Sequence, residues 1–182
     1  MLQLSFLCKL KPFIFISSAS TAGIVDGSLA PPSVIAKSNP YAVSKWAAEK
    51  LVRRAHRLGL PTCIIRPGMI TAHSSTGACN RSTLYLQYDI LAPRANYFAG
   101  DYVGRFIIGC KQLGAFFYSP AEIEFIPVDF VAQAIVALAS QSESIGAVYH
   151  IANPATVTFT KLGHLFMKAG MAMKGTFCNI KI

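Results

Sequence analysis

The chain has 182 residues, long enough for one domain with a buried core. Hydrophobic residues make up 53% of it, but no apolar run reaches the roughly 18 residues of a membrane helix, so no membrane partner is expected. The formal net charge is +9, yet the basic residues are scattered without interleaved aromatics, which argues against a nucleic-acid partner and favours solvated surface charge.

The cysteine pattern and the N-terminus both favour a cytoplasmic protein. The five cysteines are widely spaced and form no C-x-x-C, so neither a metal site nor a disulfide framework is expected, and reduced thiols fit best. Lys9 and Lys11 interrupt the first apolar stretch, which leaves only "FIFI", too short for the core of a signal peptide.

Residues 11–68 predict a strand, a loop, a helix and a second strand. The run "KPFIFISS" (11–18) is apolar and β-branched, and 19–39 is rich in Ser, Ala, Gly and Pro. Asn39-Pro40 can open a helix, which Gly59 ends, and "PTCIIRPG" (61–68) reads as another buried strand. This order predicts a right-handed parallel crossover.

The rest of the chain continues the alternation, except that residues 69–100 have little regular pattern. The expected elements are a helix over 101–116, a strand over 122–128, a helix over 128–140 with Asp129 in its first turn, a strand over 147–152, and a helix from 158 capped by Thr158 or Thr160. We therefore expect an α/β fold whose parallel sheet includes 11–18, 61–68 and 123–127.

Tyr41 and Lys45 form a Y-x-x-x-K pair at the start of the expected helix. Residues i and i+4 share one helix face. A nearby ammonium stabilises a phenolate, so such a tyrosine exchanges protons more readily near neutral pH, and the lysine can also hold a sugar hydroxyl. Ser18, at the end of the first strand, is placed to bind a substrate carbonyl oxygen. The pair alone is a weak motif, because it arises readily by chance, but its position after a strand-end serine favours catalysis.

The histidines give a weaker signal than this pair. His56, His150 and His164 are typical of packed or solvated side chains without metal-like spacing. His73 lies shortly after the second strand, where a substrate could pass, so a functional role stays open. Asp129 is better explained as a helix-orienting residue than as a catalytic one.

Several stretches, in order, resemble the extended short-chain dehydrogenase/reductases: "FIFISSAS", "PYAVSKWAAEKLV", "LPTCIIRPGMIT", "IEFIPVDFVAQAIVAL" and "VYHIANP". The stretch "SKWAAEKLVRRAHRLGLPTCIIRPGMITAHSSTGACN" and the segment "RFIIGCKQLGAF" are similar to the thioester reductase domains of carboxylic acid reductases, aminoadipate reductases and nonribosomal peptide synthetases. The resemblance covers roughly residues 3–170 and is poor over 81–100.

This resemblance implies specific roles. Ser18 would polarise the thioester carbonyl, Tyr41 would protonate the oxyanion, and Lys45 would bind the nicotinamide ribose. Pro67, Gly68 and Ile70 would lie along the nicotinamide. The implied hydride source is NADPH, with NADH possible, and the implied partner is an acyl or peptidyl carrier protein with a phosphopantetheine arm. The product would be an aldehyde, or an alcohol after a second reduction.

The sequence also departs from the family pattern. No G-x-x-G-x-x-G or G-x-G-x-x-G precedes Ser18, although such a turn normally holds the cofactor pyrophosphate. We therefore expect residues 1–152 to be the C-terminal half of a doubly wound, Rossmann-like domain, with "MLQLSFLC" as the end of a helix, and 153–182 to begin a small substrate-binding region. Impaired cofactor binding follows.

Two alternatives remain open on the sequence alone. One is another extended reductase, acting on a fatty acyl-CoA, a nucleotide sugar or a steroid. The other is a non-catalytic fragment or binding module.

Overall fold

The structure, a computed structural model, describes residues 1–7, 9–23, 40–78, 109–171 and 176–178. The contacts divide the chain into two compact units, residues 1–69 with 130–152, and residues 70–129 with 153–182. Whether the chain divides functionally at residue 152 stays a prediction. Within the described residues, no helix combines the length and apolar composition needed to cross a bilayer.

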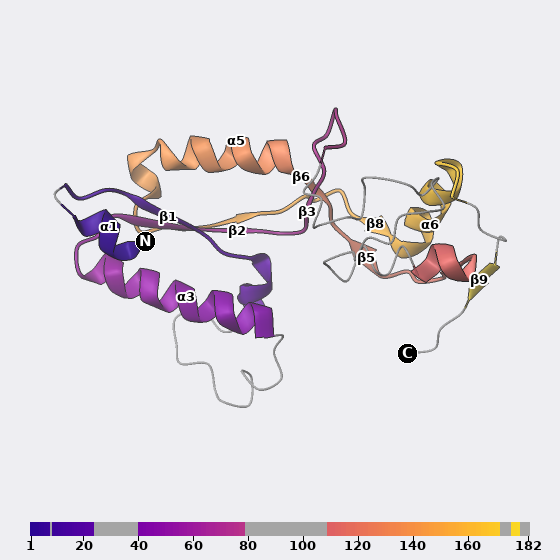
Figure 1. The fold of residues 1–182 in the computed structure, drawn as a ribbon, viewed down its shortest axis with the longest axis horizontal. Coiled ribbons are helices and arrows are strands. Elements are labelled where there is room, and N and C mark those ends of the chain that lie inside the picture. Colours follow the sequence, from indigo (N-terminus) through magenta and orange to yellow (C-terminus); the bar gives the residue numbers. More distant parts are fainter. Residues whose placement is uncertain (8, 24–39, 79–108, 172–175, 179–182) are drawn as a thin grey trace. The chain divides into compact units, whose positions relative to one another are not determined.

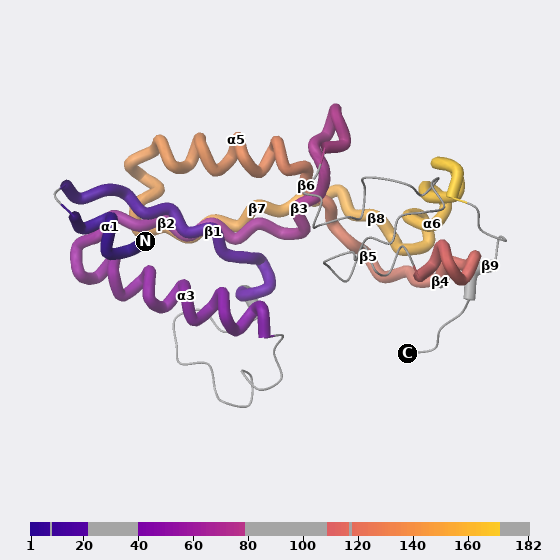
Figure 2. Tube along the Cα trace, viewed as in Figure 1, coloured from indigo at the N-terminus to yellow at the C-terminus, as the bar shows by residue number. Residues whose placement is uncertain are grey.

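The first unit contains a three-stranded parallel sheet. Its strands are β1 (Phe13–Ile16), β2 (Thr62–Pro67) and β7 (Val148–Ile151), in the order β1-β2-β7, and Figure 2 shows them running side by side. All six residues of β2, the central strand, are buried. The predicted parallel pairing of 11–18 with 61–68 is confirmed.

Helices cover both faces of this sheet (Figure 1), as a doubly wound α/β fold requires. α3 (Pro40–Arg57) lies on one face and α5 (Val128–Ala139) on the other. Pro40 suits the first helical position because its missing N–H is not needed there, and Gly59 follows α3 with a φ of 94°. Apolar side chains from both helices and the sheet are buried in this unit: Val52, Ala55, Leu60, Cys63, Ile65 and Val131.

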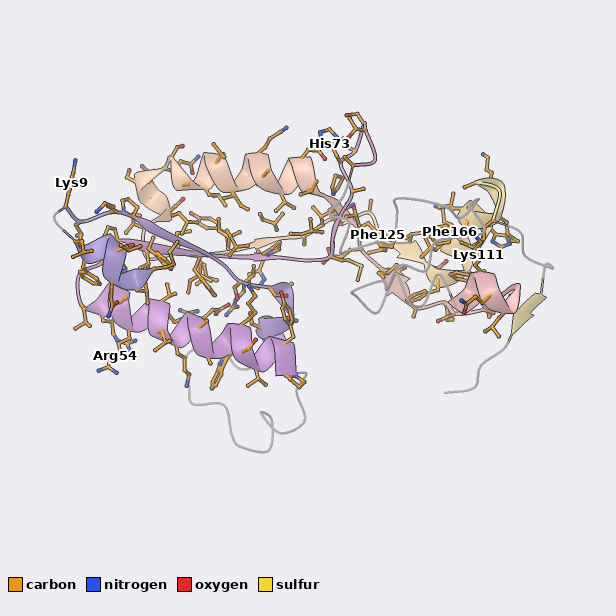
Figure 3. All side chains as sticks on the ribbon, viewed as in Figure 1. Lys9, Arg54, His73, Lys111, Phe125 and Phe166 are labelled. Atoms are coloured by element: carbon orange, nitrogen blue, oxygen red, sulfur yellow. The ribbon has the colours of Figure 1, made fainter. Side chains whose placement is uncertain are left out.

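Three shorter elements also lie in the described part of the first unit. They are α1 (Leu2–Phe6), the 3₁₀ turn η1 (Ala19–Gly23) after β1, and a second 3₁₀ turn, η2 (Ser142–Ser144). The short helix expected at the N-terminus and the strand expected at 147–152 are therefore present. On the outer face of α3, Arg54 points away from the sheet (Figure 3) and is exposed.

The described part of the second unit contains short strand pairs, the helix α6 (Phe159–Lys168) and a short helical stretch over 109–113. β3 (Ile70–Thr71) runs parallel to β6 (Ile126–Pro127), β4 (Ala115–Phe117) runs parallel to β9 (Thr176–Cys178), and β5 (Glu122–Ile123) runs antiparallel to β8 (Val157–Thr158). The helix α6 packs on β4, where the ring centroids of Phe116 and Phe166 lie 6.2 Å apart. Thr158 is its N-cap and accepts from the Lys161 N–H.

Two expected elements differ from those observed. The stretch 122–128 is not a strand of the main sheet but forms β5 and β6, because the Asn153 side chain occupies the Phe125 carbonyl between them. The third place in the sheet belongs to β7. The helix expected over 101–116 is described only from 109, and it ends at 113 because Gly114 adopts a φ of 65° before β4. Of the stretch 69–100, in which the sequence has little regular pattern, residues 79–100 lie outside the described residues.

Candidate active site

Most of the predicted site residues of the first unit gather at the carboxyl edge of its sheet. The strands are parallel and Ile16 is paired with Ile65, so the residues that follow β1 and β2 emerge on the same side. The Ser17 N–H donates to the Ile65 carbonyl at 2.7 Å, and the Gly68 N–H donates to the Ile151 carbonyl at 2.9 Å. Ser18, Pro67 and Gly68 therefore share the edge at which open α/β sheets bind ligands.

Lys45 connects the helix to this edge. Its Nζ donates to the carbonyl oxygen of Ile16, the last residue of β1, at 3.1 Å. The same ammonium lies 5.8 Å from the ring centroid of Tyr41, one turn earlier on α3, and 5.6 Å from that of Phe15. An ammonium has three N–H donors, so one bond to Ile16 leaves capacity for a ligand hydroxyl. The structure thus brings Tyr41 and Lys45 together beside the end of β1.

Ser18 lies in the turn that follows β1. Its hydroxyl is 2.9 Å from the Ser20 hydroxyl and accepts from the Ser20 N–H at 3.3 Å. Its carbonyl accepts from the Thr21 hydroxyl at 2.7 Å and from the Thr21 N–H at 3.1 Å. The backbone of Ser18 is therefore well fixed, while the expected meeting of its hydroxyl with that of Tyr41 stays a prediction.

Ile70 belongs to the second unit, where it pairs with Ile126. Its place along a nicotinamide therefore also stays a prediction.

A buried polar cluster beneath this edge was not predicted from the sequence. Glu49 lies on α3 one turn after Lys45 and is 2% exposed, and its partner Arg66, on β2, is 3% exposed. Arg66 donates through Nη2 to Glu49 Oε2 at 2.6 Å and through Nε to Oε1 at 2.9 Å. Oε1 also accepts from the hydroxyls of Ser17 and Thr21, the latter at 3.1 Å. One carboxylate thus joins the helix, the central strand and the turn that carries Ser18.

The charge of Glu49 is stabilised by these partners. Burial alone would raise the pKa of this carboxyl, but the hydrogen bonds and positive charge of Arg66, with the Ser17 and Thr21 hydroxyls, hold it below the ordinary value. The sequence did contain a signal. Glu49 falls on the apolar face of α3, and Arg66 lies inside an apolar strand. Opposite charges at two buried positions are expected to pair.

In the second unit, Asp129 ties the loop after β3 to the start of α5. Its carboxylate accepts from the N–H and the hydroxyl of Ser74, at 2.9 and 2.8 Å, and these bonds hold the pKa of Asp129 below its usual value. His73 Nδ1 accepts from the backbone N–H groups of Ser75 and Thr76 in the same loop. The structure therefore gives Asp129 an organising position, and a role of His73 toward substrate stays open.

Comparison with known proteins decides the family. A family model described as "Male sterility protein", of NAD-binding type, matches residues 1–135. The chain belongs to this male sterility protein family. The NAD-binding type of this family supports the nicotinamide cofactor that the resemblance implied.

Two relatives of the chain are named as reductases. The chain is 32% identical over 144 residues to aldehyde reductase lnbA of Aspergillus flavus, which covers 79% of the chain and 12% of the relative. It is also 32% identical over 159 residues to the L-2-aminoadipate reductase large subunit of Eremothecium gossypii, covering 78% of the chain and 10% of the relative. The chain therefore spans about a tenth of the length of these relatives.

A solved structure gives the same assignment. The terminal R domain of the myxalamid PKS-NRPS biosynthetic pathway superposes with a TM-score of 0.71 at 36% identity, over 92% of this chain and 39% of that one. The predicted kinship with the thioester reductase domains of nonribosomal peptide synthetases and aminoadipate reductases is confirmed.

Proposed function

We propose that this male sterility family chain carries the reducing centre for an acyl thioester held on the phosphopantetheine arm of a carrier protein. The supporting observation is the placement of Lys45, which binds the end of β1 and lies beside the Tyr41 ring at the carboxyl edge of the sheet. In this proposal Tyr41 is the proton donor and Lys45 is the ribose-binding cation, and both act beside the turn of Ser18.

Each residue has a defined task in this proposal. Ser18 donates a hydrogen bond to the thioester carbonyl oxygen and so polarises the carbonyl. NADPH, when bound, supplies the hydride that adds to the carbonyl carbon. Tyr41 donates a proton to the oxygen, which gives a hemithioacetal. Cleavage of its carbon–sulfur bond then releases an aldehyde, and the sulfur leaves as the free thiol of the carrier arm.

The residues at this edge of the sheet fit the nicotinamide end of the cofactor better than its pyrophosphate end. Lys45 can donate to ribose hydroxyls, and Pro67 and Gly68 end the neighbouring strand at the same edge. A glycine-rich pyrophosphate turn of the G-x-G-x-x-G type does not occur in the sequence. The proposed reaction is therefore best sought at high cofactor concentration.

The test uses residues 1–182 with millimolar NADPH and an acylated carrier protein, with aldehyde trapped and quantified. The expected result is slow aldehyde release that Tyr41→Phe lowers by about 10²–10⁴-fold, the usual contribution of a general acid. Tyr118→Phe serves as the matched control, since Tyr118 is an exposed tyrosine of the other unit. No aldehyde from the wild-type chain, or equal loss in both variants, would reject the proposal.

A further inference from the structure

Glu49 is buried, although it lies on the same helix face as Tyr41 and Lys45. The spacing of the three residues is four and four, so they form one stripe along α3. Tyr41 is 54% exposed, whereas Glu49 is 2% exposed and its carboxylate is occupied by Arg66, Ser17 and Thr21. Any effect of Glu49 on a reaction must therefore pass through these neighbours.

Those neighbours bracket the candidate catalytic serine. Ser17 and Thr21 both donate their hydroxyls to Glu49 Oε1, and Ser18 lies between them. Thr21 also donates to the Ser18 carbonyl through its hydroxyl and its N–H. The turn is thus attached to α3 through Glu49 and to β2 through the Ser17 N–H, which donates to Ile65.

Arg66 secures the other side of the same carboxylate. Its guanidinium donates to both carboxylate oxygens of Glu49, and its Nη1 lies 3.4 Å from Nε2 of His150 on β7. Stability is a weak reason to keep such a buried pair, because well-packed apolar residues of similar size are often at least as stabilising. Apolar residues, however, could not hold the Ser17 and Thr21 hydroxyls in a fixed orientation.

We propose that Glu49, held by Arg66, is a positioning residue that fixes the turn of residues 17–21 so that Ser18 faces the Tyr41–Lys45 pair. The consequence for catalysis rests on the function proposed above. The consequence for the turn itself does not, and it can be measured in the chain without cofactor.

The test separates the tether from the ion pair. Ser17→Ala with Thr21→Val removes both hydroxyl tethers but keeps the Glu49–Arg66 pair, and valine matches the shape of the fully buried threonine. Glu49→Met with Arg66→Met removes the pair and the tethers together. Ser140→Ala is the control, because its hydroxyl donates to the Val136 carbonyl one turn back on α5, away from the turn of residues 17–21.

Hydrogen exchange in residues 1–182 gives the first readout. Both double variants should speed exchange at the Ser17 and Thr21 amides by tenfold or more, while the Ile64 amide of β2, which donates to Ala147, keeps its wild-type rate. Unchanged exchange in the turn would overturn the proposal. Equal acceleration in the turn and in β2 would also overturn it, since that reports loss of overall stability alone.

Kinetics give the second readout wherever the wild-type chain reduces the thioester. The tether variant should lower kcat by about 10- to 100-fold with KM for the thioester little changed, because a small misplacement of a reacting group can have an effect of that size. A wild-type chain without activity rejects the proposed function but leaves the exchange result to decide the positioning role. Normal kcat in a variant with a loosened turn would overturn the link to Ser18.

Discussion

The Lys45 ammonium donates to the Ile16 carbonyl oxygen at 3.1 Å and thereby joins the first turns of α3 to the carboxyl end of β1. A parallel crossover brings the N-terminus of its helix and the carboxyl ends of its strands to the same edge of the sheet. The lysine that would hold a cofactor ribose is consequently a structural contact as well.

The first prediction concerns this lysine. Lys45→Met should lower any NADPH-dependent reduction by about 10²–10⁴-fold, because both the ribose contact and the cation beside Tyr41 are lost. Lys50→Met is the matched control on the same helix, where the ammonium lies 4.1 Å from the Trp46 ring centroid. Its rate should be unchanged, with at most about 0.5–1 kcal/mol of stability lost. Equal rates for the two variants, measured as aldehyde release, would contradict the assignment.

The second prediction concerns the stability of the buried ion pair. Glu49→Met or Arg66→Met alone should destabilise the fold by about 3–5 kcal/mol, because each leaves an uncompensated buried charge. The double variant should recover most of that loss. Urea unfolding of the four proteins, analysed as a double-mutant cycle, measures the coupling. Additive losses would show that the two side chains do not act as a pair.

The third prediction is the pH dependence of the same pair. The native pKa of Glu49 lies below its unfolded value, because the bonds and charge of Arg66 and the hydroxyls outweigh burial. Its contribution to stability is therefore complete above the ordinary pKa of about 4.3 and is lost as the pH falls through the lower native value. The difference in unfolding free energy between wild type and the Glu49–Arg66 double methionine variant should therefore shift in favour of the variant as the pH falls from neutrality to below about 4.3. A constant difference would show that Glu49 does not supply the dependence.

Sequence reasoning succeeded where the determining interactions are local. The strand 11–18, the helix opened by Pro40 and the pairing with 61–68 follow from apolar runs and termination residues that lie next to one another. The Tyr41–Lys45 contact follows from i, i+4 geometry alone. The family resemblance rested on these segments together with 105–116, 123–138 and 148–154.

The features that the sequence did not predict depend on contacts between distant segments. Glu49 meets Ser17 and Arg66 from 32 and 17 residues away, so the network follows from the packing of α3 on the sheet rather than from any local pattern. The stretch 122–128 has a strand-like composition. The Asn153 side chain, however, donates a hydrogen bond to the Phe125 carbonyl, and the stretch is divided into β5 and β6 at this point. Nothing within the stretch itself signals that partner.

The fourth prediction tests packing in the second unit. A Cβ at Gly163 of α6 would lie 2.7 Å from Cδ1 of Phe116, a residue that is 2% exposed and has little room to move. Gly163→Ala should therefore cost about 1–3 kcal/mol, despite the better helix propensity of alanine. Gly109→Ala is the same change at a helical position with open space, and it should be neutral or stabilising. Thermal unfolding compares the two, and a stabilised Gly163→Ala would contradict the observed contact.

The last prediction concerns how residues 1–182 hold the cofactor. In the proposed function, Lys45 and the Pro67–Gly68 strand end contact the nicotinamide and its ribose, but the sequence has no glycine-rich turn to present backbone N–H groups to a pyrophosphate. The adenosine half of NADPH should then add little affinity. We expect NADPH and reduced nicotinamide mononucleotide to bind with similar dissociation constants of about 1 mM or weaker, equivalent to about −4 kcal/mol or less in magnitude. Calorimetric titration of both ligands measures this ratio, with Lys45→Met expected to weaken both equally. A micromolar dissociation constant for NADPH together with a millimolar one for the mononucleotide would mean that another segment of the chain forms a phosphate site.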